Sequence, residues 1–188
     1  MRPTHDTSEP SAWVARFAGL VPDRGSVLDV AAGHGRNGRL FARRGCRVTA
    51  IDRDSDALGD LTREAGIETI LADLENGSPW PLAERRFDAV IVVNYLYRPL
   101  LPVLCESVAP GGVLIYETFG AGNEAFGRPR NPDFLLREGE LLAAVRDRFR
   151  VIAYEHGKVD QPRPAMLQRI CAQHGGEAAG DLLQSNRL

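Results

Sequence analysis

Short apolar runs alternate with amphipathic stretches along most of the chain. The apolar runs have the length and composition of strands buried on both faces of a parallel sheet. The stretches between them repeat apolar residues roughly every three or four positions, as helices with one buried face do. This alternation predicts an α/β fold, a mostly parallel sheet with helices on both faces. We expect strands at residues 26–30, 47–51, 67–71, 87–93, 113–118, 149–154 and 165–172.

The predicted helices are bounded by residues that commonly start and stop helices. Ser11 and Asp54 stand where a side chain can cap a first turn, and Gly45 and Gly66 follow the last turns of two helices. The polar, proline-containing link between the last two strands is too short for a helical crossover, so we expect those strands to be antiparallel. Helices are expected at residues 12–19, 35–44, 54–65, 98–108 and 138–147.

The chain of 188 residues has the size of one domain, and we assign residues 1–188 to it. Its polar ends, residues 1–10 and 174–188, are expected to be loose. Residues 119–136 break the alternation, because they are rich in glycine, proline and asparagine. A structureless segment of this length is uncommon in a compact domain. We interpret it as a lid over a bound molecule, with a disordered surface loop as the alternative.

Composition and charge argue against several classes of function. The formal net charge of −2 gives no electrostatic indication of nucleic-acid binding, and a local basic patch is the alternative that it leaves open. Three widely spaced cysteines, and histidines without ligand spacing, argue against a disulfide framework and against a metal site. No apolar run is long enough to span a bilayer, and the first residues lack a signal-peptide core. We therefore expect a cytoplasmic protein with no metal, nucleic-acid partner or membrane partner.

The most informative segment is residues 27–35, a glycine loop that joins a predicted strand to a predicted helix. Its continuation from Gly33 to Gly38 matches the dinucleotide pattern G-x-G-x-x-G, but Asp29 lies inside the strand, where such folds are usually apolar. No Gly-Lys-Ser/Thr follows, which excludes a P-loop. The glycines allow positive φ and a close approach to a ligand, and a plain tight turn is the alternative. Gly38, which completes the literal pattern, is expected to be incidental.

Two acidic residues follow strands at the same predicted edge of the sheet. Asp52 ends the second strand, where a carboxylate can accept both hydroxyls of a ribose. A helix cap is the alternative, but Asp54 is the better cap, so we expect Asp52 to be free for a ligand. Asp73 follows the third strand and can accept from an adenine amino group, with a surface turn as the alternative. Together with the glycine loop, these acids predict a site for an adenosine-containing ligand.

Five segments, in this order along the chain, resemble the successive motifs of class I S-adenosylmethionine-dependent methyltransferases. The chain is most similar to the small single-domain members of the tellurite-resistance or ubiquinone-biosynthesis type. The resemblance implies a Rossmann-like, seven-stranded, mostly parallel sheet with helices on both faces and an antiparallel last strand. It also implies S-adenosylmethionine as cofactor and S-adenosylhomocysteine as product. The segments are residues 27–35, 48–52, 72–74, 87–93 and 109–115.

The resemblance also assigns roles to residues at matching positions. The glycine loop would wrap the methionine part, supported by Asp29, while Asp52 would bind the ribose and Asp73 the adenine. One departure is Ala31, where the family often has glycine, because an alanine is strained if this position needs positive φ. The implied cofactor-binding residues are Asp29, Ala31, Gly33, Gly35, Asp52, Arg53, Asp73, Leu74 and Asn94.

The acceptor side is expected after the fourth strand and in the 119–136 segment. Residues 94–99 lack an Asn/Asp-Pro-Pro-Tyr/Phe motif, which argues against the DNA and glutamine N-methyltransferases. Tyr95 and Tyr97 are candidates to line the acceptor pocket, with ordinary packing as the alternative. Arg98 is a candidate to bind an anionic acceptor, with a solvated charge as the alternative. Arg128, together with Arg130, can recognise a carboxylate or phosphate.

We therefore predict methyl transfer from S-adenosylmethionine to a small-molecule acceptor, carried out by a monomer or homodimer. Alignment of donor and acceptor would supply much of the rate. A general base is needed only for a protonated acceptor, and the candidate bases are Tyr95, Tyr97, Glu117 and His156. An NAD-dependent oxidoreductase and a non-catalytic S-adenosylmethionine-binding module are the alternatives.

Overall fold

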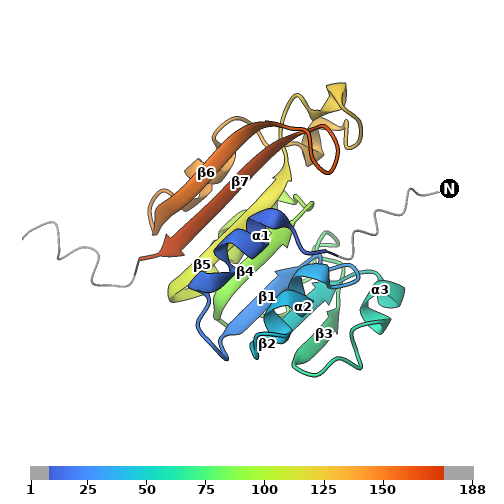
Figure 1. The fold of residues 1–188 in the computed structure, drawn as a ribbon, viewed down its shortest axis with the longest axis vertical. Helices are drawn as coiled ribbons and strands as arrows, with labels where there is room; N and C mark the ends of the chain where they lie inside the picture. The colour runs from blue at the N-terminus through green and yellow to red at the C-terminus, as the bar shows by residue number, and fades with distance from the viewer. Residues whose placement is uncertain (1–8, 176–188) are drawn as a thin grey trace, which may run out of the picture.

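The computed structural model describes residues 9–175. Seven strands form one sheet in the order β3-β2-β1-β4-β5-β7-β6. The pairs among β1 to β5 are parallel, whereas β7 runs antiparallel to both β5 and β6 (Figure 1). This confirms the predicted seven-stranded, mostly parallel sheet with an antiparallel last strand. The bounds are β1 Ser26–Val30, β2 Arg47–Asp52, β3 Ile67–Leu71, β4 Phe87–Val93, β5 Val108–Phe119, β6 Phe149–Val159 and β7 Ala165–His174.

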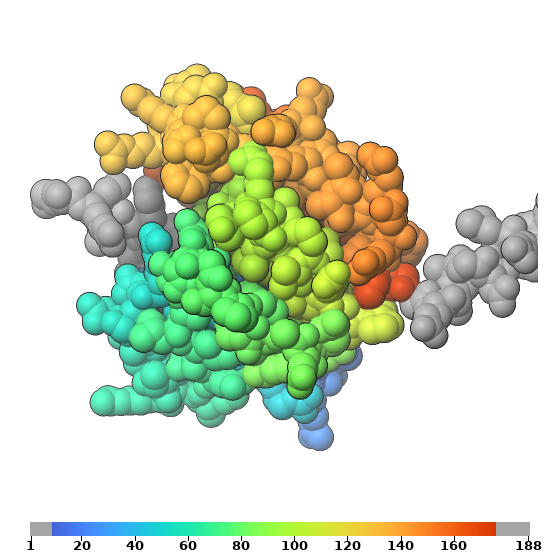
Figure 2. Space-filling view, turned by 180° about the vertical axis from the view of Figure 1, so that it is seen from behind, coloured from blue at the N-terminus to red at the C-terminus, as the bar shows by residue number. Residues whose placement is uncertain are grey.

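Helices cover both faces of the sheet, as predicted. Helices α1 and α2 lie on one face (Figure 1), while α4, α5 and residues 72–86 cover the other, which is seen from behind in Figure 2. Successive residues of β1 point to opposite faces, so Val27 packs with α1 and α2, and Leu28 packs with α4 and α5. The helices are α1 Ala12–Phe17, α2 Arg36–Ala42, α3 Ser55–Gly59, α4 Leu101–Glu106 and α5 Glu140–Val145, with 3-10 turns η1 Ala18–Leu20, η2 Arg98–Leu100, η3 Asn123–Ala125 and η4 Pro132–Phe134.

Both predicted helix caps are present, but the helices are shorter than predicted, and α3 is shortened the most. The Ser11 hydroxyl accepts from two backbone N–H groups of α1, and the Asp54 carboxylate accepts from two of α3. The helix expected over residues 54–65 ends at Gly59 and continues as tight turns. Gly59 and Asp60 are poor helix formers, which favours this early end. Leu61 is nevertheless fully buried, because the turn after α3 still packs it against the sheet.

Gly111 and Gly112 precede the predicted fifth strand, 113–118, but lie inside the observed strand β5. Strand β5 already begins at Val108, and the register with β4 shifts before Ala89 pairs with Val113. A Cβ at Gly112 would lie 2.9 Å from the carbonyl oxygen of Asp88, so a side chain does not fit there. These residues therefore form a bulge that brings the backbones of β4 and β5 close together.

Residues 119–136 form a loop whose two ends meet. Gly120 bridges Leu136, and the amide of Ala121 donates to the Leu136 carbonyl at 2.9 Å. The Asn123 side chain is buried and bonds to Pro129 inside the loop and to Met166 of β7. The loop is thus tied to the sheet by its own hydrogen bonds.

The predicted loose ends lie largely outside the described residues, which include only 9–10 and 174–175 of them. Within residues 9–175, no helix is long and apolar enough to cross a membrane. The same residues contain no group of three or more potential metal ligands.

Candidate functional site

The carboxyl ends of β1, β2 and β3 meet at one edge of the sheet, together with the exit of β4. Ligands of open α/β folds bind at this edge. A cavity of about 220 Å³ opens there, which we call the strand-end cavity. Five of the residues predicted to bind the cofactor line it, so the structure brings them together from three separate strand ends. The lining residues are Ala31, Asp52, Arg53, Ala72, Asp73, Leu74, Glu75 and Tyr95.

The loop between β1 and α2 adopts the left-handed conformation at alternate residues. The φ angles are 52° at Ala31, 53° at Gly33 and 72° at Gly35. The question raised by Ala31 is therefore answered: the position has positive φ, at a cost of roughly 1–2 kcal/mol for a non-glycine residue. At Gly35, a Cβ would also lie 2.5 Å from Leu61, so glycine is required there for space as well.

Asp29 lies beneath the loop and is almost completely buried. Its carboxylate accepts from the amide of Gly38 at 2.8 Å. A Cβ at Gly38 would lie 3.1 Å from both Asp29 and Val48, so the expectation that Gly38 is incidental was wrong. The third glycine lets α2 pack closely on the strands. Burial raises the pKa of Asp29 to about 7, although the Gly38 amide and the charge of Arg36 act in the opposite direction.

Asp52 is less free than expected. One carboxylate oxygen accepts from the amide of Gly33 at 2.8 Å, and the other accepts from the amide of Asp54 at 2.9 Å. Asp54 itself caps α3, as predicted. Each carboxylate oxygen has a second lone pair, so Asp52 can still accept from two hydroxyl groups in the cavity. The side chain therefore links the shape of the glycine loop to the contents of the cavity.

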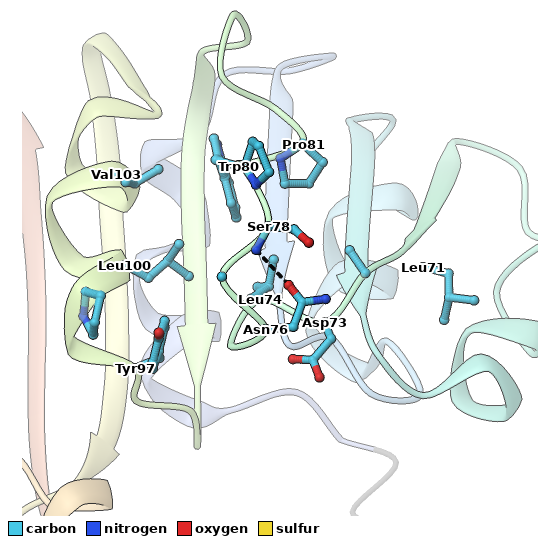
Figure 3. A pocket seen from close by; sticks show the side chains of 14 residues that line it. Leu71, Asp73, Leu74, Asn76, Ser78, Trp80, Pro81, Tyr97, Leu100 and Val103 are labelled. Atoms are coloured by element: carbon cyan, nitrogen blue, oxygen red, sulfur yellow. Dashed lines mark hydrogen bonds between the residues drawn. The ribbon is translucent and has the colours of Figure 1, made fainter.

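Asp73 has features of both roles considered above, a surface turn and a contact to a ligand. Its carboxylate accepts from the amide of Glu75 at 2.9 Å, which makes a local turn. The same side chain also lines the strand-end cavity and a second cavity of about 540 Å³. Figure 3 shows this second cavity between the connection from β3 and helix α4, with Trp80 on one side and Val103 on the other. The sequence reasoning missed it, although Trp80 between two prolines was an available signal.

The residues after β4 divide between the two cavities. Asn94 has a φ of 58° and is exposed, and its amide donates to the Glu117 carbonyl at 2.9 Å. This turn places Tyr95 in the strand-end cavity, whereas Tyr97 lines the second cavity (Figure 3). The two tyrosines therefore do not line one shared pocket.

Arg98 is engaged by residues of the protein itself. Its guanidinium makes two hydrogen bonds to the Glu140 carboxylate, at 2.7 and 3.0 Å, and two to the carbonyls of Asp133 and Leu135. Four of its five N–H donors are thus used within the protein. Arg98 is therefore neither a solvated charge nor a side chain free to bind an anionic acceptor, the two roles considered above. These bonds fasten the second half of the 119–136 loop to the turn after β4.

Other acceptor-side candidates lie in different surroundings. Glu117 is buried, accepts from the Ser11 hydroxyl at 2.9 Å and pairs with Arg169 at 2.6 Å. His156 stands against Gly120, where a Cβ would lie 3.2 Å from its Nε2. Arg128 is exposed on the 119–136 loop. The structure does not gather these side chains around one point.

Comparisons with known proteins identify the fold and the family. A family model described as a methyltransferase domain matches residues 27–112, which contain every predicted cofactor residue. The malonyl-[acyl-carrier protein] O-methyltransferase of Enterobacter lignolyticus (strain SCF1) is 33% identical over 101 residues. These matches support a class I S-adenosylmethionine-dependent methyltransferase over residues 27–112. The matches agree with the predicted resemblance and with S-adenosylmethionine as cofactor, and they speak against the NAD-dependent alternative raised by the glycine pattern.

Two solved structures show how far the methyltransferase fold extends along the chain. TehB from Haemophilus influenzae superposes with a TM-score of 0.69 at 18% identity, over 86% of this chain and 61% of its own. The 1,6-didemethyltoxoflavin-N1-methyltransferase of Burkholderia thailandensis, solved with its substrate and S-adenosylhomocysteine, superposes with a TM-score of 0.63 at 20% identity, over 92% and 80%. The Enterobacter match spans 50% of this chain but only 39% of that relative.

Proposed function

We propose that the protein transfers a methyl group from S-adenosylmethionine to a small-molecule acceptor. The observation that carries this proposal is the strand-end cavity, where Ala31, Asp52, Arg53, Asp73 and Leu74 converge from three strand ends. The names of two similar methyltransferases specify didemethyltoxoflavin, a small molecule, and a malonyl group carried on a protein, so each name specifies a small chemical group as the acceptor.

Each part of the site has a role that follows from its geometry. The left-handed backbone of residues 31–35 leaves room for the methionine part to lie against main chain. Asp52 accepts from the ribose hydroxyls while it holds the loop through the Gly33 amide. Asp73 accepts from the adenine amino group, beside Leu74. Asp29 supports the loop from below through Gly38, and Asn94 closes the methionine end.

The chemical step requires little from the protein beyond alignment of the methyl donor and the acceptor. Bound S-adenosylmethionine would supply the methyl group on a sulfonium, whose carbon–sulfur electron pair would stay on sulfur when an acceptor lone pair bonds to the methyl carbon. The residues of the loop hold the donor so that the acceptor can approach in line. No general base is assigned, because Glu117 is buried and paired with Arg169. A carboxylate acceptor would need none.

The acceptor side is proposed to be closed by the loop of residues 119–136. Arg128 and Arg130 are exposed there and suit an anionic acceptor. Arg98 is proposed to hold this loop in place and not to touch the acceptor, because four of its donors are already used. Residence in the cytoplasm and a monomeric or homodimeric state remain predictions.

Calorimetry and a transfer assay test this function in sequence. We expect S-adenosylmethionine and S-adenosylhomocysteine to bind, and NAD not to bind. A screen of small carboxylates, amines and phenols with methyl-labelled S-adenosylmethionine should then reveal transfer. Binding without transfer to any acceptor would favour the non-catalytic module, and binding of NAD alone would contradict the proposal.

A further inference from the structure

Glu117, near the end of β5, has a buried carboxylate whose two oxygens have different partners. Its Oε1 accepts from the Ser11 hydroxyl at 2.9 Å, and its Oε2 lies 2.6 Å from the Nε of Arg169 on β7. A buried ion pair is often no more stabilising than apolar side chains of similar volume. The pair is therefore a candidate to position other groups of the protein.

Ser11 connects this carboxylate to the first turn of α2. Its hydroxyl also accepts from the amides of Trp13 and Val14, so that it caps α1. Its own amide donates to the Asn37 side chain at 2.9 Å, and both residues are almost completely buried. Asn37 belongs to the first turn of α2, directly after the glycine loop. One serine thus joins the start of α1 to the end of β5 and to the start of α2.

Residues 9–11 span the exit of β4. Two hydrogen bonds attach this segment to α2, because the Glu9 carbonyl also accepts from the Arg36 guanidinium at 3.1 Å. At the other end of the segment, the serine hydroxyl reaches the carboxylate on β5. Strand β4 lies between β1 and β5 in the sheet, and its exit at Asn94 donates an amide to the Glu117 carbonyl. The segment therefore lies between the glycine loop and the loop that follows β5.

We propose that Glu117 is a positioning residue, which holds residues 9–11 through Ser11 as a fixed wall of the acceptor site. This inference rests on the proposed function, because it takes the exits of β4 and β5 as the side from which the acceptor approaches. Glu117 then acts through Ser11 and not as the general base that the sequence suggested. Arg169 balances the charge of the buried carboxylate.

The substitution Ser11→Ala tests the link without any ligand. It removes the hydroxyl that reaches Glu117 together with the cap of α1, so amide hydrogen exchange of residues 9–17 should become about 5- to 30-fold faster. Ser11→Thr keeps a hydroxyl and should exchange at nearly the wild-type rate. The matched control Asp54→Ala removes a cap with two amide bonds from α3 and should leave exchange of residues 9–17 unchanged. Unchanged exchange in Ser11→Ala would overturn the inference.

A double variant removes the ion pair and keeps the protein folded. Glu117→Leu combined with Arg169→Met replaces two buried charges by apolar side chains of similar size, a change that is often close to neutral for stability. Exchange of residues 9–17 should become faster, because the Ser11 hydroxyl loses its acceptor. Adding Ser11→Ala to this double variant should change the KM of the acceptor little further, since both changes remove the same contact. Fully additive effects on that KM would overturn the claim that Glu117 acts through Ser11.

Kinetics with an acceptor from the transfer screen separate a wall of the acceptor site from a part of the cofactor site. Ser11→Ala and the double variant should each raise the KM of the acceptor about 3- to 10-fold, the loss of about one hydrogen bond. The affinity for S-adenosylhomocysteine should change less than about twofold, and Ser11→Thr should restore the KM.

The outcomes distinguish this inference from the proposed function. An unchanged acceptor KM in Ser11→Ala, with a wild type that transfers methyl groups, would overturn the inference and leave the proposed function intact. A loss of affinity for S-adenosylhomocysteine at unchanged KM would also overturn it, since the segment would then belong to the cofactor site. Absence of methyl transfer by the wild type would overturn both proposals.

Discussion

The cofactor region and the acceptor region of this sheet edge are built in different ways. The cofactor region consists of short loops directly after β1, β2 and β3, in which Asp29 and Asp52 bond to backbone amides. The acceptor region is held by ion pairs between residues that are distant in sequence, namely Arg98 with Glu140 and Glu117 with Arg169. The proposed cofactor region is therefore shaped by contacts close in sequence, whereas the proposed acceptor region depends on the assembled fold.

The first prediction contrasts one carboxyl group from each region. Burial raises the pKa of Asp29 to about 7 from 3.8, so the folded protein keeps a proton that the unfolded chain loses. Stability should therefore fall as the pH rises from about 4 to about 7, by up to about 4 kcal/mol. Asp29→Asn should remove this loss, which urea unfolding of both proteins across that range would measure.

Glu140 should behave in the opposite way. Burial alone would raise the pKa of Glu140, but hydrogen bonds from Arg98 and the Arg137 amide outweigh it and hold the pKa below its ordinary value. Its contribution to stability is present above pH about 4.5 and is lost as the pH falls further. If Asp29→Asn and wild type showed parallel pH profiles between pH 4 and 7, the contrast would be refuted.

The second prediction disrupts the acceptor region alone. Arg98→Ala leaves the partly buried Glu140 carboxylate and two carbonyls without their donor, and should destabilise the protein by about 3 kcal/mol. Proteolysis within residues 119–136 should become faster, while affinity for S-adenosylhomocysteine stays the same. Arg98→Lys keeps the charge but not the forked geometry and should recover only part of the stability. A tenfold loss of cofactor affinity would show that the regions are not separate.

The third prediction disrupts the cofactor loop. Gly35→Ala adds a methyl group 2.5 Å from Leu61 at a φ of 72°, and should cost about 2–3 kcal/mol and weaken cofactor binding. The matched control is Gly45→Ala, at a φ of 81° with open space around it, which should cost only about 1 kcal/mol and leave binding unchanged. If Gly35→Ala and Gly45→Ala lowered the thermal unfolding temperature equally, close packing against Leu61 would not be the cause.

The smallest expected effect comes from Ala31→Gly. Glycine relieves the left-handed strain but makes the unfolded chain more flexible, so stability should rise by no more than about 1 kcal/mol. Affinity for S-adenosylhomocysteine should change less than about twofold, because the substitution keeps the backbone conformation of the loop. A clear loss of stability on thermal unfolding would show that the Ala31 methyl group makes packing contacts that outweigh the strain.

Local patterns predicted the cofactor region better than the acceptor region. The strands and the Asp54 cap follow from neighbours close in sequence, so local patterns were enough to predict them. The sequence left open whether Ala31 has a positive φ, and the structure shows that it does. Gly38 was misjudged because its role depends on Val48, which approaches it only in the folded sheet. The Arg98–Glu140 pair joins residues 42 positions apart, and no local pattern encodes it.

Calorimetry on matched variants tests most directly whether the strand-end cavity binds S-adenosylmethionine through Asp52. Asp52→Ala removes a carboxylate in the cavity, whereas Asp54→Ala removes the adjacent helix cap outside it. We predict that Asp52→Ala weakens S-adenosylmethionine binding by about 1–3 kcal/mol and that Asp54→Ala leaves it unchanged. Wild-type affinity in Asp52→Ala would contradict the account.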